Sequence, residues 1–144
     1  MKKVVVVVFL FISLCSFSQN WKNNIEEAKT EAKTLNKNIL LVFSGSDWCA
    51  PCIKLDRTIF QTEVFKAEAA LKWVLVKADF PKKKGNLLSA ELTESNKKLA
   101  EKYNREGNFP LVVLLDATGK VIGITGYKNV SPTEYVKLLN SMVK

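Results

Sequence analysis

Residues 39–52 read ILLVFSGSDWCAPC, and this stretch decides how the rest of the chain is interpreted. Its first five residues form a continuous apolar run, which is typical of a strand buried on both faces of a sheet. Polar residues and a glycine end the run, and a helical pattern begins at Ala50. Cys49 is therefore expected at the N-terminus of a helix, beyond the carboxyl end of a buried strand. Open α/β sheets place reactive groups at that edge.

The two cysteines of this stretch are the candidate chemical groups. A helix N-terminus favours an anion, and such a position lowers the pKa of a thiol to about 3.5 to 7.5, so Cys49 is the predicted attacking thiolate. Cys52 lies one turn further on, close enough to form a disulfide, and is the predicted resolving thiol. Pro51 fits the first helical turn, and Trp48 offers an apolar surface beside the sulfur. An inert structural disulfide is the alternative, although so short a loop gains little from a bridge.

Composition excludes several other classes of protein. The chain has 144 residues, 47% hydrophobic and 25% charged, which fits one compact domain. It contains no histidine, so imidazole catalysis is excluded, and two thiolates alone do not complete a zinc site. We expect neither metal nor cofactor. The formal charge of +8 comes from lysines interleaved with glutamates, which is typical of solvated helix faces, so no nucleic-acid partner is predicted.

The N-terminus has the pattern of a secretory signal peptide. A positive start, Met1–Lys3, precedes the apolar run Val4–Leu14, and Ser16 and Ser18 put small residues at the two positions that a signal peptidase reads. We predict a signal peptide over 1–18, cleaved near Ser18, and a single domain over 19–144. The apolar run is shorter than the ~20 residues of a membrane span, so no stable span is expected after cleavage.

The predicted export places the mature protein in the periplasm or outside the cell, where disulfides persist. A lipoprotein tethered through Cys15 is the alternative. It is disfavoured because Leu14 stands where such signals require a small side chain.

Hydrophobic periodicity predicts an α/β sandwich with one mixed sheet. The expected elements are a helix over 21–35, a strand over 39–43, a helix from 50 that breaks near Gln61 and resumes through Ala69, a strand over 73–78, a helix from 88 that ends near Gly107, strands over 111–115 and 121–125, and a last helix opened by a capping box at Ser131–Glu134. Two right-handed strand-helix-strand crossovers would make a parallel core. The hairpin turn at 116–119 would add an antiparallel edge strand.

Three motifs together resemble the thioredoxin superfamily. They are Trp-Cys-Ala-Pro-Cys at 48–52, Asn-Phe-Pro at 108–110 and Asp-Ala-Thr-Gly-Lys at 116–120. The chain is most similar to exported bacterial thioredoxin-like thiol-disulfide oxidoreductases. The resemblance implies a three-layer sandwich, attack by Cys49, release of the mixed disulfide by Cys52, and a cis Pro110 that faces the cysteines. Phe109 would present its backbone to a substrate.

The sequence departs from the family pattern beneath the cysteines. Phe43 stands about where thioredoxins keep a buried acid that helps the resolving thiol lose its proton. Lys77 and Asp79 share one face of the second strand, and they either lie beneath Cys52 or are solvated residues at the end of the strand.

The function predicted from these residues is thiol-disulfide exchange with protein substrates. The implied partners are protein thiols or disulfides and an unidentified redox partner, and the protein is expected to be a monomer. The Cys-Ala-Pro-Cys sequence resembles reducing members of the family, which favours a reductase or isomerase over a strong oxidant. The alternative is a binding or chaperone module whose cysteine pair is structural.

Overall fold

The computed structural model describes residues 19–143. The predicted signal peptide, its cleavage near Ser18 and the alternative tether at Cys15 lie outside the described residues. The elements, in chain order, are β1 (Trp21–Lys22), α1 (Ile25–Leu35), β2 (Asn38–Ser44), α2 (Ala50–Leu55), the π-helical segment η1 (Asp56–Phe60), α3 (Glu63–Lys72), β3 (Trp73–Asp79), the 3-10 turn η2 (Lys84–Asn86), α4 (Ala90–Tyr103), β4 (Leu111–Leu115), β5 (Val121–Thr125) and α5 (Pro132–Ser141).

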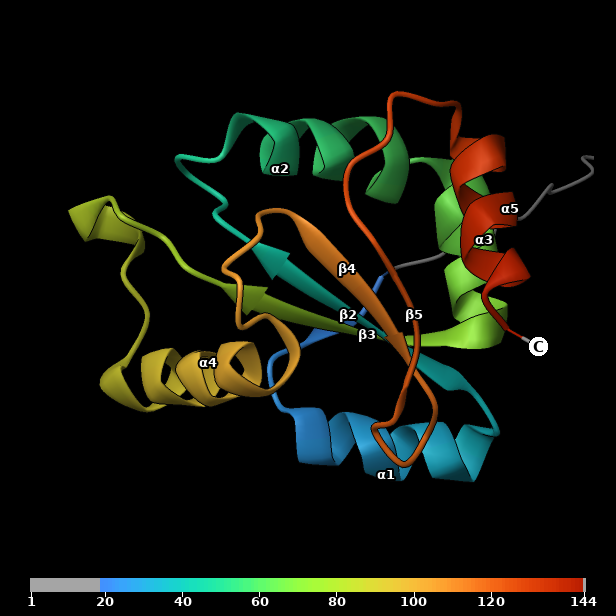
Figure 1. Ribbon diagram of the computed structural model, residues 1–144, viewed down its shortest axis with the longest axis horizontal. Coiled ribbons are helices and arrows are strands. Elements are labelled where there is room, and N and C mark those ends of the chain that lie inside the picture. The colour runs from blue at the N-terminus through green and yellow to red at the C-terminus, as the bar shows by residue number, and fades with distance from the viewer. Residues whose placement is uncertain (1–18, 144) are drawn as a thin grey trace, which may run out of the picture.

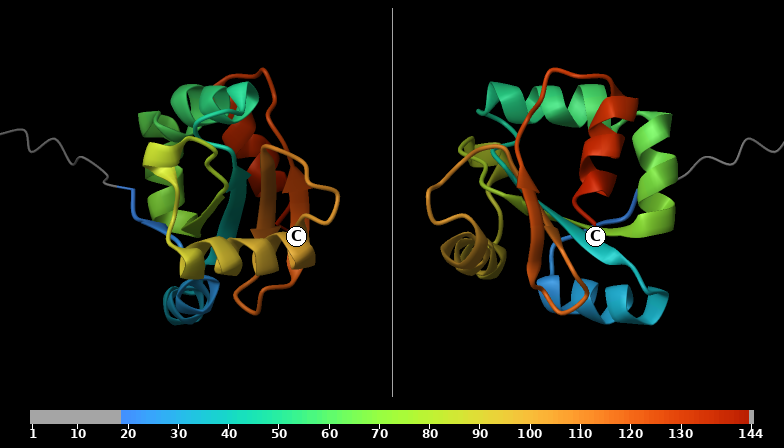
Figure 2. Two further views of the ribbon diagram at one scale, coloured as in Figure 1. Left: turned by 90° about the vertical axis from the view of Figure 1, so that its left-hand side faces the viewer. Right: turned by 45° about the vertical axis from the view of Figure 1, so that its right-hand side comes forward.

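The fold is the predicted three-layer α/β sandwich around one mixed sheet. Helices α1 and α4 cover one face of the sheet, and α2, α3 and α5 cover the other (Figures 1 and 2). The apolar run of β2 is buried on both sides because alternate residues enter two different cores. Leu40 and Val42 pack with the aromatic residues of η1, α3 and α5, while Leu41 and Phe43 pack with α1 and α4. This double burial explains why β2 has no polar positions in its centre.

The sheet has the order β1-β3-β2-β4-β5. Strands β1, β3 and β2 are parallel, whereas β4 is antiparallel to β2 and β5 is antiparallel to β4. The predicted parallel core and closing hairpin are therefore confirmed. The second predicted crossover is wrong, because β3 and β4 run in opposite directions.

The route of the chain between these strands gives the reason. Phe43, near the end of β2, pairs with Ala78 near the end of β3 and with Leu111 at the start of β4. The loop after β3 runs outward from the sheet, and α4 brings the chain back to the same edge (Figure 1). A strand that starts where its neighbours end must run antiparallel to them.

The N-terminal helix also begins later than the predicted 21–35. Trp21 pairs with Leu75 as part of the edge strand β1, and its ring lies 5.5 Å from that of Phe60. The side chain of Asn24 then caps α1 by accepting hydrogen bonds from the backbone N–H groups of Glu26 and Glu27. A side-chain cap of this kind satisfies amides that have no partner within the helix, so it fixes the start of α1.

The remaining predicted elements are confirmed, including both strands of the hairpin, but two helices end elsewhere than expected. Helix α3 continues three residues beyond Ala69, and α4 ends at Tyr103 instead of near Gly107, because the Asn104 side chain bonds the backbone of Asn108 and turns the chain there. Gly119 has a φ of 91°, as the predicted turn requires. The break near Gln61 is also confirmed, but η1 precedes it, a wider turn that sequence patterns did not indicate. Its first residue, Asp56, lies one turn beyond Cys52.

The capping box of α5 provides a test of local stability. The side-chain oxygen of Ser131 accepts from the Glu134 backbone N–H, and the Glu134 carboxylate accepts from the backbone N–H and the hydroxyl of Ser131. We predict that Ser131→Ala lowers the free energy of unfolding by about 1 kcal/mol, measured by denaturant titration. Thr133→Ala leaves the capping box intact and should lower the free energy of unfolding clearly less. An equal loss of stability in the two variants would contradict a specific role for the cap.

The stability that this capping box contributes should depend on pH. Hydrogen bonds from Ser131 lower the pKa of Glu134. A lowered folded pKa means stability that is present above the unfolded pKa and is lost as the pH falls through the folded value. Glu134→Gln should therefore lower Tm at neutral pH. The difference in Tm between this variant and wild type should become smaller at acidic pH. Glu91→Gln, in the first turn of α4, is the matched control, and an identical pH profile for both variants would refute the prediction.

Candidate active site

Cys49 and Cys52 lie at the start of α2, where the sequence predicted them. Cys49 is the N-cap residue, and its sulfur accepts a hydrogen bond from the Cys52 backbone N–H at 3.3 Å. The two residues form a disulfide with a Cα–Cα distance of 5.2 Å, and Pro51 occupies the first turn of the helix. Both cysteines are largely buried, with 5% of Cys49 and 4% of Cys52 exposed. The structure thus describes the oxidised form of the pair.

The loop between β2 and α2 is shaped by Gly45. Its carbonyl accepts hydrogen bonds from the backbone N–H groups of Trp48 and Cys49. A Cβ at Gly45 would come within 2.4 Å of the Trp48 ring, so only glycine allows the indole to pack against the loop. The indole N–H donates to the Phe80 carbonyl at 2.7 Å, which ties the loop to the end of β3. These contacts fix the position of the first cysteine.

An aromatic surface lies beside the disulfide. The Phe109 ring is 5.6 Å from the Trp48 ring and 5.5 Å from that of Phe80. Trp48 remains 39% exposed, and the Phe109–Pro110 peptide bond is cis. Thus the structure brings together Trp48 and Phe109, which lie 61 residues apart in the sequence.

The polar loop that follows β3 is anchored at the same edge. The Asp47 carboxylate accepts from the backbone N–H groups of Lys82 and Lys83 and from the Asn86 amide. These bonds, led by the one from Lys82, lower the pKa of Asp47. The Lys82 ammonium lies 3.8 Å from the centroid of the Trp48 ring, a cation–π arrangement. The loop therefore has a fixed course next to the aromatic surface.

Cys52 faces a different environment. It lines a cavity of about 260 Å³ together with polar side chains, which are those of Ser44, Ser46, Asp56, Arg57, Gln61 and Lys77. The Gly45 backbone N–H lies 3.5 Å from the Cys52 sulfur. The two cysteines therefore have different surroundings, with an aromatic surface next to Cys49 and a polar cavity next to Cys52.

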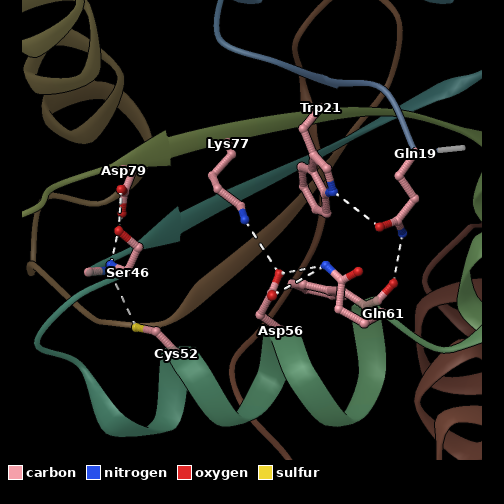
Figure 3. A network of polar contacts seen from close by, with 10 residues as sticks. Gln19, Trp21, Ser46, Cys52, Asp56, Gln61, Lys77 and Asp79 are labelled. Atoms are coloured by element: carbon pink, nitrogen blue, oxygen red, sulfur yellow. Dashed lines mark hydrogen bonds and ion pairs between the residues drawn. The ribbon is translucent and has the colours of Figure 1, made fainter. Parts of the chain in front are cut away.

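Figure 3 shows how the charged groups near Cys52 are arranged. The Lys77 ammonium is 3.4 Å from a carboxylate oxygen of Asp56 and 4.9 Å from the centroid of the Trp21 ring. Asp79 accepts hydrogen bonds from the backbone N–H and the hydroxyl of Ser46. The structure thus places Lys77 at the cavity that Cys52 lines, whereas Asp79 holds the loop before the cysteines.

Asp56 was not identified from the sequence. Its only signal was its spacing, four residues after Cys52, which puts the two side chains on one side of a helix. Phe43, at the position where an acid was expected from the family, is fully buried among the apolar side chains of the opposite core.

Within residues 19–143, no three histidine, cysteine or acidic side chains gather as metal ligands. In the same part of the chain, no helix has the length and apolar character that crossing a bilayer requires.

Comparisons with known proteins agree with this geometry. A family model described as thioredoxin-like matches residues 20–117. The chain is 36% identical over 118 residues to the disulfide bond reductase DsbH of Chlamydia pneumoniae, covering 82% of this chain and 69% of that protein. It is 26% identical over 95 residues to the thioredoxin-related protein DsbJ of the same organism, covering 66% of this chain but 26% of DsbJ.

Solved structures show the same relationship. A DsbH oxidoreductase superimposes with a TM-score of 0.83 at 30% identity, covering 97% of this chain and 94% of that one. A disulphide isomerase from Xylella fastidiosa Temecula1 has a TM-score of 0.62 at 21% identity, covering 83% and 88% of the two chains, and supports the fold alone. With its fold, its cysteine pair and these matches, the chain belongs to the thioredoxin-like family of thiol-disulfide oxidoreductases.

Proposed function

We propose that the protein is exported and reduces or isomerises disulfides in other proteins through Cys49 and Cys52. The observation that carries the proposal is the position of Cys49, whose sulfur caps a helix next to an exposed aromatic surface. The match to DsbH, which is named a disulfide bond reductase, supports the reducing direction. The pattern of residues 1–18 supports export.

In this reaction the reduced protein attacks first through the Cys49 thiolate. Its sulfur bonds to one sulfur of the substrate disulfide, and the other substrate sulfur leaves as a thiolate and takes a proton from water. Cys52 then attacks the Cys49 sulfur, which releases the second substrate thiolate and re-forms the internal disulfide. Two electrons pass from the cysteine pair to the substrate, and an unidentified redox partner must return them.

The surface next to Cys49 is the proposed substrate site. Trp48 and Phe109, whose rings lie against each other, provide one apolar contact surface for a bound peptide, and the backbone at Phe109 and Pro110 is the proposed hydrogen-bonding edge. Pro51 stiffens the turn between the two sulfurs, so the ring can open and close with little rearrangement. The protein is proposed to act as a monomer.

The roles of the two cysteines can be tested separately. With a fluorescent disulfide-linked peptide as substrate, Cys49→Ala should reduce turnover to the uncatalysed background. Cys52→Ala should accumulate a mixed disulfide on Cys49, detected by mass spectrometry, because the resolving thiol is missing. If Cys49→Ala retains full activity, or if peptide binding persists while the wild type never reduces the peptide, the protein is a binding module and the proposal fails.

The direction of electron flow follows from the reduction potential. We predict a potential nearer to thioredoxin's value of about −270 mV than to the ~−120 mV of strong oxidants. Equilibration of the purified protein with glutathione buffers, followed by thiol alkylation, measures it directly. A value close to that of the strong oxidants would exclude the reductase assignment.

A further inference from the structure

A run of lysines lies beside the aromatic surface next to Cys49. Residues 82–84 are three consecutive lysines in the loop after β3, and all three are exposed. Figure 1 shows this loop on the same side of the molecule as the loop that leads into α2. The proposed function uses the aromatic surface but gives these lysines no role. Their charges nevertheless border the proposed substrate site.

Lys82 is held in place at both ends of its side chain. Its backbone N–H and that of Lys83 each donate to the Asp47 carboxylate at 2.9 Å, and Asp47 directly precedes Trp48 in the chain. The Lys82 ammonium lies 3.8 Å from the centroid of the Trp48 ring. A lysine in an ordinary solvated loop has neither contact. Because Lys82 is ordered before any substrate arrives, less conformational entropy is lost when it binds one.

The three ammonium groups have no acidic partner in the part of the chain that the structure describes. Every ion pair between residues 19 and 143 involves other lysines. Asp47, which anchors the loop, accepts hydrogen bonds from two backbone N–H groups and from the Asn86 amide. An ammonium group has three donors, and the ring occupies only one side of it. Lys82 can therefore still bind a carboxylate.

A substrate at Cys49 must come close to this charge. Trp48 is the residue next to Cys49, and its ring is 39% exposed with Lys82 over it. A protein segment whose disulfide reaches the Cys49 sulfur therefore brings the neighbours of its own cysteine to the Trp48 ring. An acidic neighbour forms an ion pair with the Lys82 ammonium, whereas a basic neighbour is repelled by it.

We propose that Lys82 is a specificity-determining residue, which binds an Asp or Glu carboxylate of the substrate over the Trp48 ring and so favours protein disulfides with acidic flanking residues. This inference rests on the proposed function and names the class of its substrates. Lys83 and Lys84 contribute positive charge that attracts such segments, but neither contacts the Trp48 ring.

The experiment compares peptides that differ only in charge. Three fluorescent disulfide peptides carry Glu, Gln or Lys on both sides of the cysteine, and the second-order rate constant for their reduction by the pre-reduced protein is measured. Each rate is divided by the rate with dithiothreitol, which is uncharged, so that the effect of the flanks on the disulfide itself is removed. The Glu peptide should react about 2- to 5-fold faster than the Gln peptide, the range of an exposed ion pair, and the Lys peptide should react more slowly.

Three substitutions of Lys82 test its role. Lys82→Gln should bring the ratio of the Glu to the Gln peptide close to one. Lys82→Arg should keep the ratio, because a guanidinium is also a cation and also stacks on an aromatic ring. Lys82→Glu should reverse the preference in favour of the Lys peptide. In ~1 M NaCl, where the Debye length is about 3 Å, the preference of the wild type should shrink.

Two matched variants separate a specific contact from the general field of a basic protein. Lys84→Gln removes the same charge from the same loop and should keep most of the ratio. Lys33→Gln removes an exposed lysine from the last turn of α1, which leads into the start of β2, whereas Cys49 follows its end. This variant should keep the wild-type ratio.

Equal corrected rates for the three peptides with the wild type overturn the inference. A loss of preference in Lys84→Gln or Lys33→Gln as large as that in Lys82→Gln also overturns it. Should Lys82→Gln not fold, Lys82→Arg and Lys82→Glu decide, and the same ratio in both counts against the proposal. A wild type that reduces none of the peptides refutes the oxidoreductase proposal itself, whereas equal reduction of all three refutes only the role of Lys82.

Discussion

The hydrogen bond from the Cys52 backbone N–H to the Cys49 sulfur is the contact on which the site depends. This hydrogen bond forms because α2 starts at Cys49. The start of α2 is fixed in turn by β2, which is buried on both faces, and by the turn of the chain at Gly45. The carbonyl of Gly45 accepts the amides of Trp48 and Cys49, so the cysteine enters the helix as its cap. A polar residue in the centre of β2, or a side chain at Gly45, would change the position of the Cys49 sulfur without contacting it.

The disulfide separates two unlike environments. On one side, Trp48 and Phe109 form an aromatic surface that is exposed at Trp48, the proposed contact surface for a substrate protein. On the other side, Cys52 meets a polar cavity with an Asp56–Lys77 ion pair. This asymmetry fits the two proposed steps of thiol exchange, in which Cys49 meets a substrate and Cys52 loses a proton before it attacks.

The path from β3 to β4 links the fold to the site. The loop after β3 is anchored by Asp47, and α4 returns the chain to the edge where β2 and β3 end. As a result, the cis Phe109–Pro110 bond lies directly before β4, and the Phe109 ring packs against Trp48. The reversal that makes β4 antiparallel is thus the same feature that brings the second motif to the first.

The sequence alone determined the elements, the cysteine pair and its place at a helix start, because apolar periodicity, caps and turn residues act over a few neighbouring positions. Local patterns did not reveal β1, since a two-residue strand carries no periodicity of its own, nor the direction of β4, which depends on where α4 returns the chain. Only the tertiary structure brought Asp56 to Lys77 and both to the cavity of Cys52, because residues 21 positions apart meet there through the packing of η1 on β3. The contact of Trp48 with Phe109 was likewise decided by the packing of distant segments.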